Sequence, residues 1–169
     1  MELYIKRAKK GDIEAFINLM EMNKTSMYKA AKSILNNDED IADAIQETIL
    51  SCYKNIENLK EVKYFKTWMT RILINKCNDI IRANKNLIYI DNNQDEGYSE
   101  NLDQTLSLRE CFDRLKSDYK IVMTMYYDQG FNSKEISEIL NINESTVRTR
   151  MARGREYLRK YYLQMDREA

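Results

Sequence analysis

The last third of the chain carries basic side chains whose type and spacing suit binding to a polyanion. Residues 145–160 hold six Lys/Arg residues against a single acid, Glu156. Like charges at this density repel one another, and a nearby polyanion relieves that repulsion. Most of the six are arginines, whose planar fork pairs with phosphates and with guanine edges. The segment therefore predicts nucleic-acid binding, and a solvated basic helix face is the alternative on charge alone.

The remaining composition argues against catalysis. The chain has no histidine and only three cysteines, Cys52, Cys77 and Cys111. No glycine-rich phosphate loop and no metal-ligand spacing is found, so we expect no enzyme activity, cofactor or metal. Three widely spaced cysteines do not form a disulfide framework, suit a reducing cytoplasm and are expected in the core. No apolar run is long enough to span a bilayer, and no signal peptide opens the chain.

Charge is distributed unevenly although the net charge is zero. Residues 54–85 hold eight Lys/Arg against three Asp/Glu, whereas residues 91–103 hold five acids and no base. Two basic blocks thus flank one acidic segment. The absence of proline and the presence of only four glycines favour long helices.

Apolar residues recur at helical spacing over most of the chain, including residues 41–53, 65–81 and 115–126. Residues 84–105 break this pattern and are polar and acidic, which is typical of a tether, although a short strand at 87–90 is an alternative. We predict an all-α fold of two small helical domains, 1–83 and 106–169, joined by a flexible acidic linker, with a helix-turn-helix in the second.

The helix-turn-helix is predicted from residues 132–154. Asn132 can cap its first helix, with Glu135 as the capping-box partner. Asn141 stands where the turn requires a left-handed backbone, which asparagine tolerates better than most residues. Val147 and Met151 are expected to face the core. The side chains then expected to project outward, at positions that enter the major groove in such proteins, are Arg148, Thr149, Ala152 and Arg153.

Three segments, in this order and spacing, resemble the extracytoplasmic-function (ECF) class of bacterial sigma factors. DIADAIQETILSCYKNI resembles the family's polymerase-binding segment, FKTWMTRILINKCNDIIRANK its −10 recognition helix, and EISEILNINESTVRTRMARGREYLRKYY its −35 recognition motif. The chain differs from the family at Asn143-Glu144-Ser145, where a proline and a glycine are common, and at Asn141, where glycine is common. The resemblance implies a transcription initiation factor that brings core RNA polymerase to promoter DNA and helps to open it.

The resemblance also implies roles for individual residues. At the −35 element, Arg148, Thr149 and Arg153 would contact base edges, and Arg150 and Arg155 would contact phosphates. Residues 57–64 would hold a flipped base, whereas Trp68 is expected in the core. The residues implied at the −10 single strand, whose cations, amides and aromatic ring suit such DNA, are Tyr64, Thr67, Arg71, Asn75, Asn78 and Arg82.

A polar helix face is implied to dock on core polymerase; a solvated face with favourable helix-dipole charges is the alternative. Its residues are Asp40, Asp43, Gln46 and Glu47. The acidic linker would enter the polymerase's nucleic-acid channel, although a simple spacer fits its composition equally well. The family further implies an anti-sigma factor partner for a protein that we expect to be a cytoplasmic monomer. The competing hypotheses are a helix-turn-helix repressor and a helical adaptor that acts without polymerase.

Overall fold

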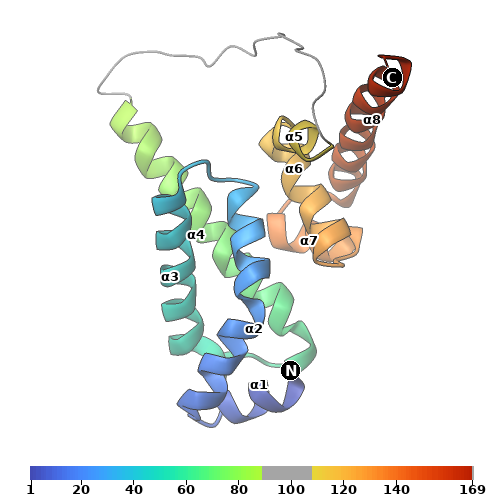
Figure 1. The fold of residues 1–169 in the computed structure, drawn as a ribbon. Helices are drawn as coiled ribbons and strands as arrows, with labels where there is room; N and C mark the ends of the chain where they lie inside the picture. The colour runs from blue at the N-terminus through green and yellow to red at the C-terminus, as the bar shows by residue number, and fades with distance from the viewer. Residues whose placement is uncertain (89–107, 169) are drawn as a thin grey trace.

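The computed structural model describes residues 1–88 and 108–168, with side chains for 1–84 and 109–160, and every regular element in these ranges is helical. The predicted all-α fold is confirmed (Figure 1). The acidic segment 91–103 lies outside the described residues. The elements are α1 (Glu2–Ala8), α2 (Ile13–Lys32), α3 (Asp38–Asn55), η1 (Ile56–Asn58), η2 (Val62–Tyr64), α4 (Phe65–Ile88), α5 (Leu108–Asp113), α6 (Ser117–Met123), η3 (Thr124–Asp128), α7 (Ser133–Leu140) and α8 (Glu144–Glu168).

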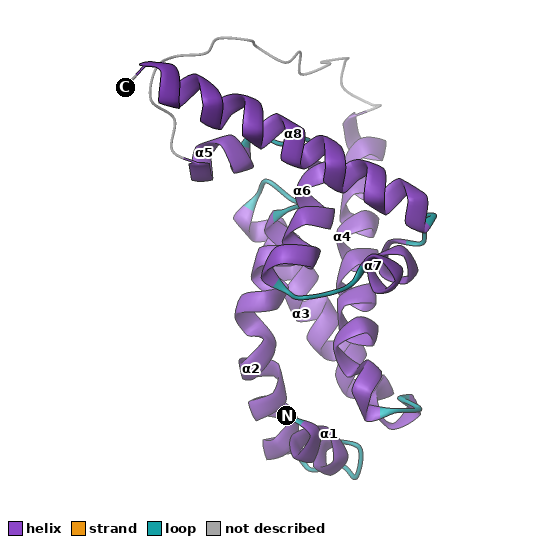
Figure 2. Cartoon of the chain, turned by 90° about the vertical axis from the view of Figure 1, so that its right-hand side faces the viewer, coloured by secondary structure: helices purple, strands orange, loops and turns teal. Residues whose placement is uncertain are grey.

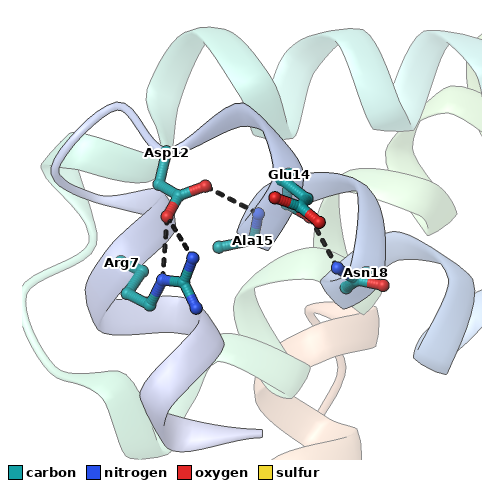
Figure 3. Close-up of polar contacts among 5 residues, drawn as sticks. All are labelled: Arg7, Asp12, Glu14, Ala15 and Asn18. Carbon is teal, nitrogen blue, oxygen red and sulfur yellow. Dashed lines mark hydrogen bonds and ion pairs between the residues drawn. The ribbon is translucent and has the colours of Figure 1, made fainter.

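Side-chain caps fix where the first long helices begin. Asp12 precedes α2 and accepts a hydrogen bond from the Ala15 amide at 2.9 Å, while its other carboxylate oxygen lies 2.7 Å from the Arg7 guanidinium (Figure 3). Asn37 caps α3 by accepting from the Glu39 amide at 2.8 Å. Each cap satisfies a backbone N–H that the helix leaves unpaired. The apolar stripes therefore start in a defined register.

The first part of the molecule has one core, built from α1 to α4. Leu19, Ile41, Phe65 and Leu73 are each at most 1% exposed within it. Cys52 and Cys77 also lie in this core, so the prediction that they are small core residues is confirmed. Burial raises the pKa of each of these two thiols to about 12, because the thiolate would lose its hydration. Both thiols are therefore protonated and unreactive at neutral pH.

Two helices depart from their predicted extents. α4 continues to Ile88, past the predicted domain end at residue 83, and occupies positions 87 and 88 of the alternative strand. The stripe over 115–126 is interrupted, because Leu115 precedes α6 and residues 124–128 form a π turn, η3. Gly130 then leaves the helical path at φ 76°. The apolar spacing predicts the buried side chains of this region but not the change in backbone winding.

The second part packs directly on the first. Ile74 of α4 is 3% exposed and belongs to the same cluster as Met125, Ile136 and Val147. Ile34, after α2, is partly buried against both cores. α7 lies along α4 (Figure 2), while α8 extends away from the body toward the C-terminus (Figure 1). The two predicted helical units therefore share a contact surface in this structure.

Polar contacts accompany this apolar surface. Lys29 Nζ of α2 lies 2.7 Å from Asp128 Oδ1 of η3. The Gln129 side-chain amide donates to the Ser26 carbonyl oxygen at 3.0 Å. The π turn thus supplies a carboxylate and, directly after it, an amide to the N-terminal part, which is consistent with the tendency of such local irregularities to carry specific contacts.

Candidate nucleic-acid interface

The helix-turn-helix has the predicted local geometry. The Asn132 side chain accepts from the Glu135 amide at 3.0 Å, and the Glu135 carboxylate accepts from the Asn132 amide at 2.9 Å, which completes the capping box. Asn141 has φ 53° and ψ 47°, the left-handed conformation expected at the turn. These contacts place the start of α8 in a fixed relation to α7.

The exposed face of α8 also agrees with the prediction. Val147 is fully buried and Met151 is 5% exposed, so both anchor the helix to the core. Gly154 lies one turn further along, where an added Cβ would come within 2.4 Å of Met123 Sδ. The outward-facing side chains are Arg148, Thr149, Ala152 and Arg153. This exposed face therefore carries an arginine at each end and the smaller side chains of Thr149 and Ala152 between them.

Glu144, the first residue of α8, connects the two helices of the motif. One carboxylate oxygen, Oε1, accepts from the Ser133 hydroxyl at 2.6 Å and from the Arg148 guanidinium at 2.7 Å. Ser133 is the first residue of α7. The hydrogen bond from Ser133, followed by that from Arg148, holds the pKa of Glu144 below its ordinary value. The carboxylate is therefore ionised at neutral pH.

Two further arginines of α8 have partners that the sequence analysis did not identify. The Arg150 guanidinium, 25% exposed, lies 2.7 Å from Asp118 of α6. The Arg155 guanidinium donates to the Tyr127 hydroxyl at 3.4 Å. Tyr127 is 59% exposed and packs edge-on against Tyr126. No sequence signal identifies these partners, because helical periodicity relates residues only within one helix.

The predicted −10 residues lie along one side of α4 and its preceding turn. Tyr64, Arg71, Asn75 and Arg82 are exposed, whereas the other two, Thr67 and Asn78, are half-buried. Their spacing of three or four residues places them on adjacent turns of one face. The described structure therefore assembles a continuous strip of an aromatic ring, amides and cations.

A groove of about 390 Å³ opens between α3 and α4 beside this strip. Asn58, from the loop predicted to hold a flipped base, lines the groove together with Asn75 of the strip. Trp68 lines it too, although its ring also packs against the first core, at 6.0 Å from the Phe65 ring. Trp68 is thus partly buried: it packs against the first core, as predicted, and it also lines the groove. The full lining is Ser51, Asn55, Asn58, Trp68, Ile72, Asn75, Lys76 and Asp79.

The predicted polymerase-binding residues lie on the outer side of α3. Asp43, Gln46 and Glu47 are exposed, and Asp40 is half-buried and accepts a hydrogen bond from the Asn84 side chain at 3.2 Å. Glu47 lies 3.2 Å from Lys76 of α4.

An exposed apolar side chain lies beside these acids. Leu50, one turn after Glu47, is 52% exposed. Tyr53, which the periodicity assigns to the core stripe, is 51% exposed and contacts Phe16 by its edge. Leu50 was not predicted as a surface contact, although its position outside the apolar stripe is visible in the helical spacing.

Comparisons with known proteins identify the family. Residues 19–87 match the family model described as Sigma-70 region 2, and residues 105–158 match that described as Sigma-70, region 4. The chain is 33% identical to the ECF RNA polymerase sigma factor SigW of Bacillus subtilis, over 92% of this chain and 93% of that protein. The chain belongs to the ECF sigma factors of the sigma-70 family.

Another relative is similar over most of its length, and two solved structures share the fold. The ECF RNA polymerase sigma-E factor of Haemophilus influenzae is 28% identical, over 91% of this chain and 90% of that protein. The fold is similar to CnrH in complex with the cytosolic domain of CnrY, with a TM-score of 0.67, 19% identity, and 95% and 96% of the two chains covered. It is also similar to RpoE in complex with the anti-sigma factor NepR from Bartonella quintana, with a TM-score of 0.71, 16% identity, and 86% and 94% covered.

Family membership confirms the predicted function. This sigma factor directs RNA polymerase to promoters and is not an enzyme. The repressor and adaptor hypotheses are not supported, because the family matches cover both helical parts and not only the helix-turn-helix. Within residues 1–88 and 108–168, no helix is both long and apolar enough to cross a membrane.

Proposed function

We propose that this sigma factor divides promoter recognition between its two helical parts. α4 takes the −10 element as a single strand, α8 takes the −35 element in the major groove, and the outer side of α3 docks on core polymerase. The observation that carries the proposal is that the three sets of side chains are held on three different helices, each with its apolar stripe buried. This assignment corresponds to domains at about 1–83 and 106–169, with the acidic linker between them.

At the −35 element, Arg148, Thr149 and Arg153 contact base edges, since they occupy the first exposed turns of the second helix of the motif. Arg150 and Arg155 contact phosphates. Arg150 already neutralises Asp118, so a phosphate at this site must share the guanidinium with that carboxylate. Tyr127 adds a hydroxyl donor beside Arg155 and extends the phosphate contact beyond α8.

At the −10 element, the strip on α4 binds the exposed strand through Tyr64, Thr67, Arg71, Asn75, Asn78 and Arg82. The groove beside it takes a base extruded from the stack. The Trp68 ring offers a stacking surface, and the Asn58 and Asn75 amides offer both donors and acceptors to a base edge. Such contacts recover the unstacking cost, which is about a few kcal/mol. The groove therefore supports the predicted flipped-base site and extends it to the α3 side of α4.

At the polymerase, Leu50 adds an exposed apolar side chain at one end of the row formed by Asp43, Gln46 and Glu47, with Asp40 at the other end. Protein interfaces usually combine apolar contacts with polar side chains around them. The pair between Glu47 and Lys76 couples this surface to α4, so docking on polymerase and binding of the −10 strand use adjacent faces of the same two helices.

The working state that we propose is a cytoplasmic monomer bound either by polymerase or by an anti-sigma factor. Two solved structures with this fold are complexes, one with the cytosolic domain of CnrY and one with the anti-sigma factor NepR, which supports such a partner for this chain. No cofactor is part of the proposal. The acidic linker enters the polymerase channel during initiation, a role that the family resemblance implies and with which its five acids are compatible.

The test combines run-off transcription with DNA binding. Purified core polymerase and the sigma factor are run on genomic fragments, and a fragment that gives a defined transcript is then used in gel-shift assays. We expect the free protein to bind this duplex weakly and to gain specific binding only with core polymerase. Nanomolar, sequence-specific binding by the free protein would contradict the proposal and favour a repressor.

A further inference from the structure

We propose that Glu144 determines −35 specificity by positioning Arg148 and by neutralising its charge. The inference rests on the proposed placement of α8 in the major groove. Glu144 does not itself need to contact DNA in this role. It restricts Arg148 to base edges and keeps it from acting as a general phosphate contact.

The geometry gives Glu144 control over where Arg148 points. Its Oε1 accepts from Ser133 at 2.6 Å, and that hydroxyl belongs to the first residue of α7. The same oxygen accepts from Arg148 at 2.7 Å. The Ser133 hydroxyl on α7 thus orients the Glu144 carboxylate, and the carboxylate in turn orients the Arg148 guanidinium. A charge-assisted hydrogen bond of this kind is short and directional, so the arginine is preorganised within the free protein.

The contact leaves most of Arg148 available to DNA. Its side chain remains 70% exposed, whereas that of Glu144 is 37% exposed. A guanidinium carries five N–H donors in a rigid fork, and the hydrogen bond to Glu144 comes from one of its nitrogens, NH2. The other donors can still meet two acceptors on a guanine edge, which is the geometry of a specific contact.

The charge of Glu144 acts against phosphate binding by Arg148. A phosphate that approaches Arg148 meets a carboxylate 2.7 Å from the guanidinium, and like charges repel. A base edge has no net charge and therefore meets a much weaker repulsion. Arg153, on the next turn of the same face, has no ion-pair partner within the described residues. The two arginines on this face therefore differ in how much phosphate binding they allow, and Glu144 raises specificity by penalising the wrong contact.

Glu144→Gln tests the charge with little change in size. The holoenzyme, made with core polymerase, is titrated with two promoter duplexes that share a −10 region and differ only in a native or scrambled −35 element. We expect the variant to bind the scrambled duplex more tightly and its salt slope on that duplex to steepen by about one, because Arg148 gains a phosphate contact. The native-to-scrambled affinity ratio should fall about tenfold, because the scrambled duplex gains one charge-assisted contact that the native duplex, where Arg148 stays on the base edge, does not.

Two variants control for other effects of the substitution. Glu156→Gln removes the same charge from the same helix, at a residue paired with Lys160 at 3.5 Å, away from the turn. It should leave the native-to-scrambled ratio unchanged. Glu144→Asp keeps the charge and should keep the wild-type salt slope. An equal change in Glu144→Gln and Glu156→Gln, or the same slope in Glu144→Asp and Glu144→Gln, would overturn the proposal.

Arg148→Ala distinguishes a failure of this inference from a failure of the proposed function on which it rests. If Arg148→Ala leaves discrimination at the −35 element unchanged, the placement of α8 on the DNA is wrong. If Arg148→Ala abolishes discrimination while Glu144→Gln retains it at the wild-type salt slope, only the role of Glu144 is wrong. A thermal melt of each variant confirms that the compared proteins are folded.

Discussion

At the scale of single residues, the arginines of α8 are chemically identical but differ in their surroundings. Arg148 pairs with Glu144, Arg150 with Asp118, and Arg155 with Tyr127. Arg153 has no such partner within the described part of the chain. A free cation contributes fully to phosphate attraction, whereas a paired one has part of its field cancelled. The effects of substituting these arginines should therefore differ in kind as well as in size.

Arg153→Ala and Arg155→Ala are expected to separate base recognition from phosphate binding. Arg153→Ala should lower transcription from a cognate promoter and reduce the effect of changing its −35 sequence, at a cost of about 1–3 kcal/mol in discrimination. Arg155→Ala should weaken binding to all sequences alike and lower the salt slope by about one. Run-off yields and holoenzyme binding across a salt series measure both effects. Uniform losses in both variants would show that Arg153 does not contact bases.

Substitutions on α3 should weaken polymerase binding without unfolding the protein. Leu50→Ser removes an apolar side chain that is already 52% exposed, so the core is unaffected. Asp43→Ala and Glu47→Ala remove the neighbouring acids. We expect lower affinity for core polymerase in a pull-down, with an unchanged thermal melt. Leu3→Ser is the matched control, because Leu3 is 66% exposed on α1 and lies outside the proposed surface. Equal polymerase binding by the Leu3 and Leu50 variants would instead indicate that the polar side of α3 is only a solvated helix face.

At the scale of helices, local chemistry made much of the fold predictable. The apolar spacing identified the buried sides of α3 and α4, and the residues at the turn predicted both the Asn132 cap and the left-handed Asn141. The sequence did not reveal the π turn η3, because its buried residues fit an ordinary helical stripe. Spacing also assigned Tyr53 to the core, although its ring is 51% exposed, because spacing does not show how far the neighbouring helices cover a side chain.

Asn141 should respond to substitution according to its backbone conformation. For a residue with a Cβ, the left-handed backbone conformation costs about 1–2 kcal/mol of stability relative to glycine, and this cost is smaller for asparagine than for most residues. We expect Asn141→Gly to raise the melting temperature slightly and Asn141→Val to lower it clearly. Circular dichroism melts of both variants measure the difference. A stabilising valine would show that the turn does not constrain this backbone position.

Gly154 should be sensitive to side-chain size because α8 crosses α6 there. A Cβ at this position would lie 2.4 Å from Met123 Sδ and 3.5 Å from Tyr119 Cβ. Alanine requires the flexible Met123 side chain to move, whereas valine adds bulk that this movement does not accommodate. We expect Gly154→Val to destabilise the fold by about 1–3 kcal/mol, as overpacking usually does. Chemical denaturation of the glycine, alanine and valine forms tests the order, and equal stability of all three would contradict the close crossing.

At the scale of the whole molecule, the contact between the two helical parts was not predicted. The sequence analysis treated them as separate units on a tether, because apolar periodicity tells which side of a helix is buried but not which helix covers it. Ile74 shows the difficulty. It is apolar but lies outside the stripe of the first part, and spacing alone does not show that it belongs to the core of the second. The outward position of Arg148, Thr149 and Arg153 was predicted better, since it depends only on spacing within one helix, whereas their contacts with DNA remain predictions.

Charge reversal at Lys29 and Asp128 should test this contact in the free protein. Lys29 and Asp128 are 2.7 Å apart, and their side chains are 49% and 38% exposed. A pair this exposed is worth only about 0.2–1 kcal/mol. Lys29→Glu places two carboxylates together and should therefore loosen the contact only partly, raising the radius of gyration in small-angle scattering. We expect Ile74→Ser to raise the radius of gyration more than Lys29→Glu does, because it removes an apolar side chain that is 3% exposed at the same interface.

The double variant Lys29→Glu/Asp128→Lys is the more decisive test, since it restores opposite charges without restoring either native residue. If the ion pair itself holds the parts together, the double variant should recover the wild-type radius of gyration, and the two single reversals should not add. The hydrogen bond from Gln129 to the Ser26 carbonyl lies beside the pair and should persist in it. If the effects of the two single reversals are additive, each charge acts independently of the other and not through the ion pair. The contact between the two helical parts would then depend on Ile74 and its apolar neighbours.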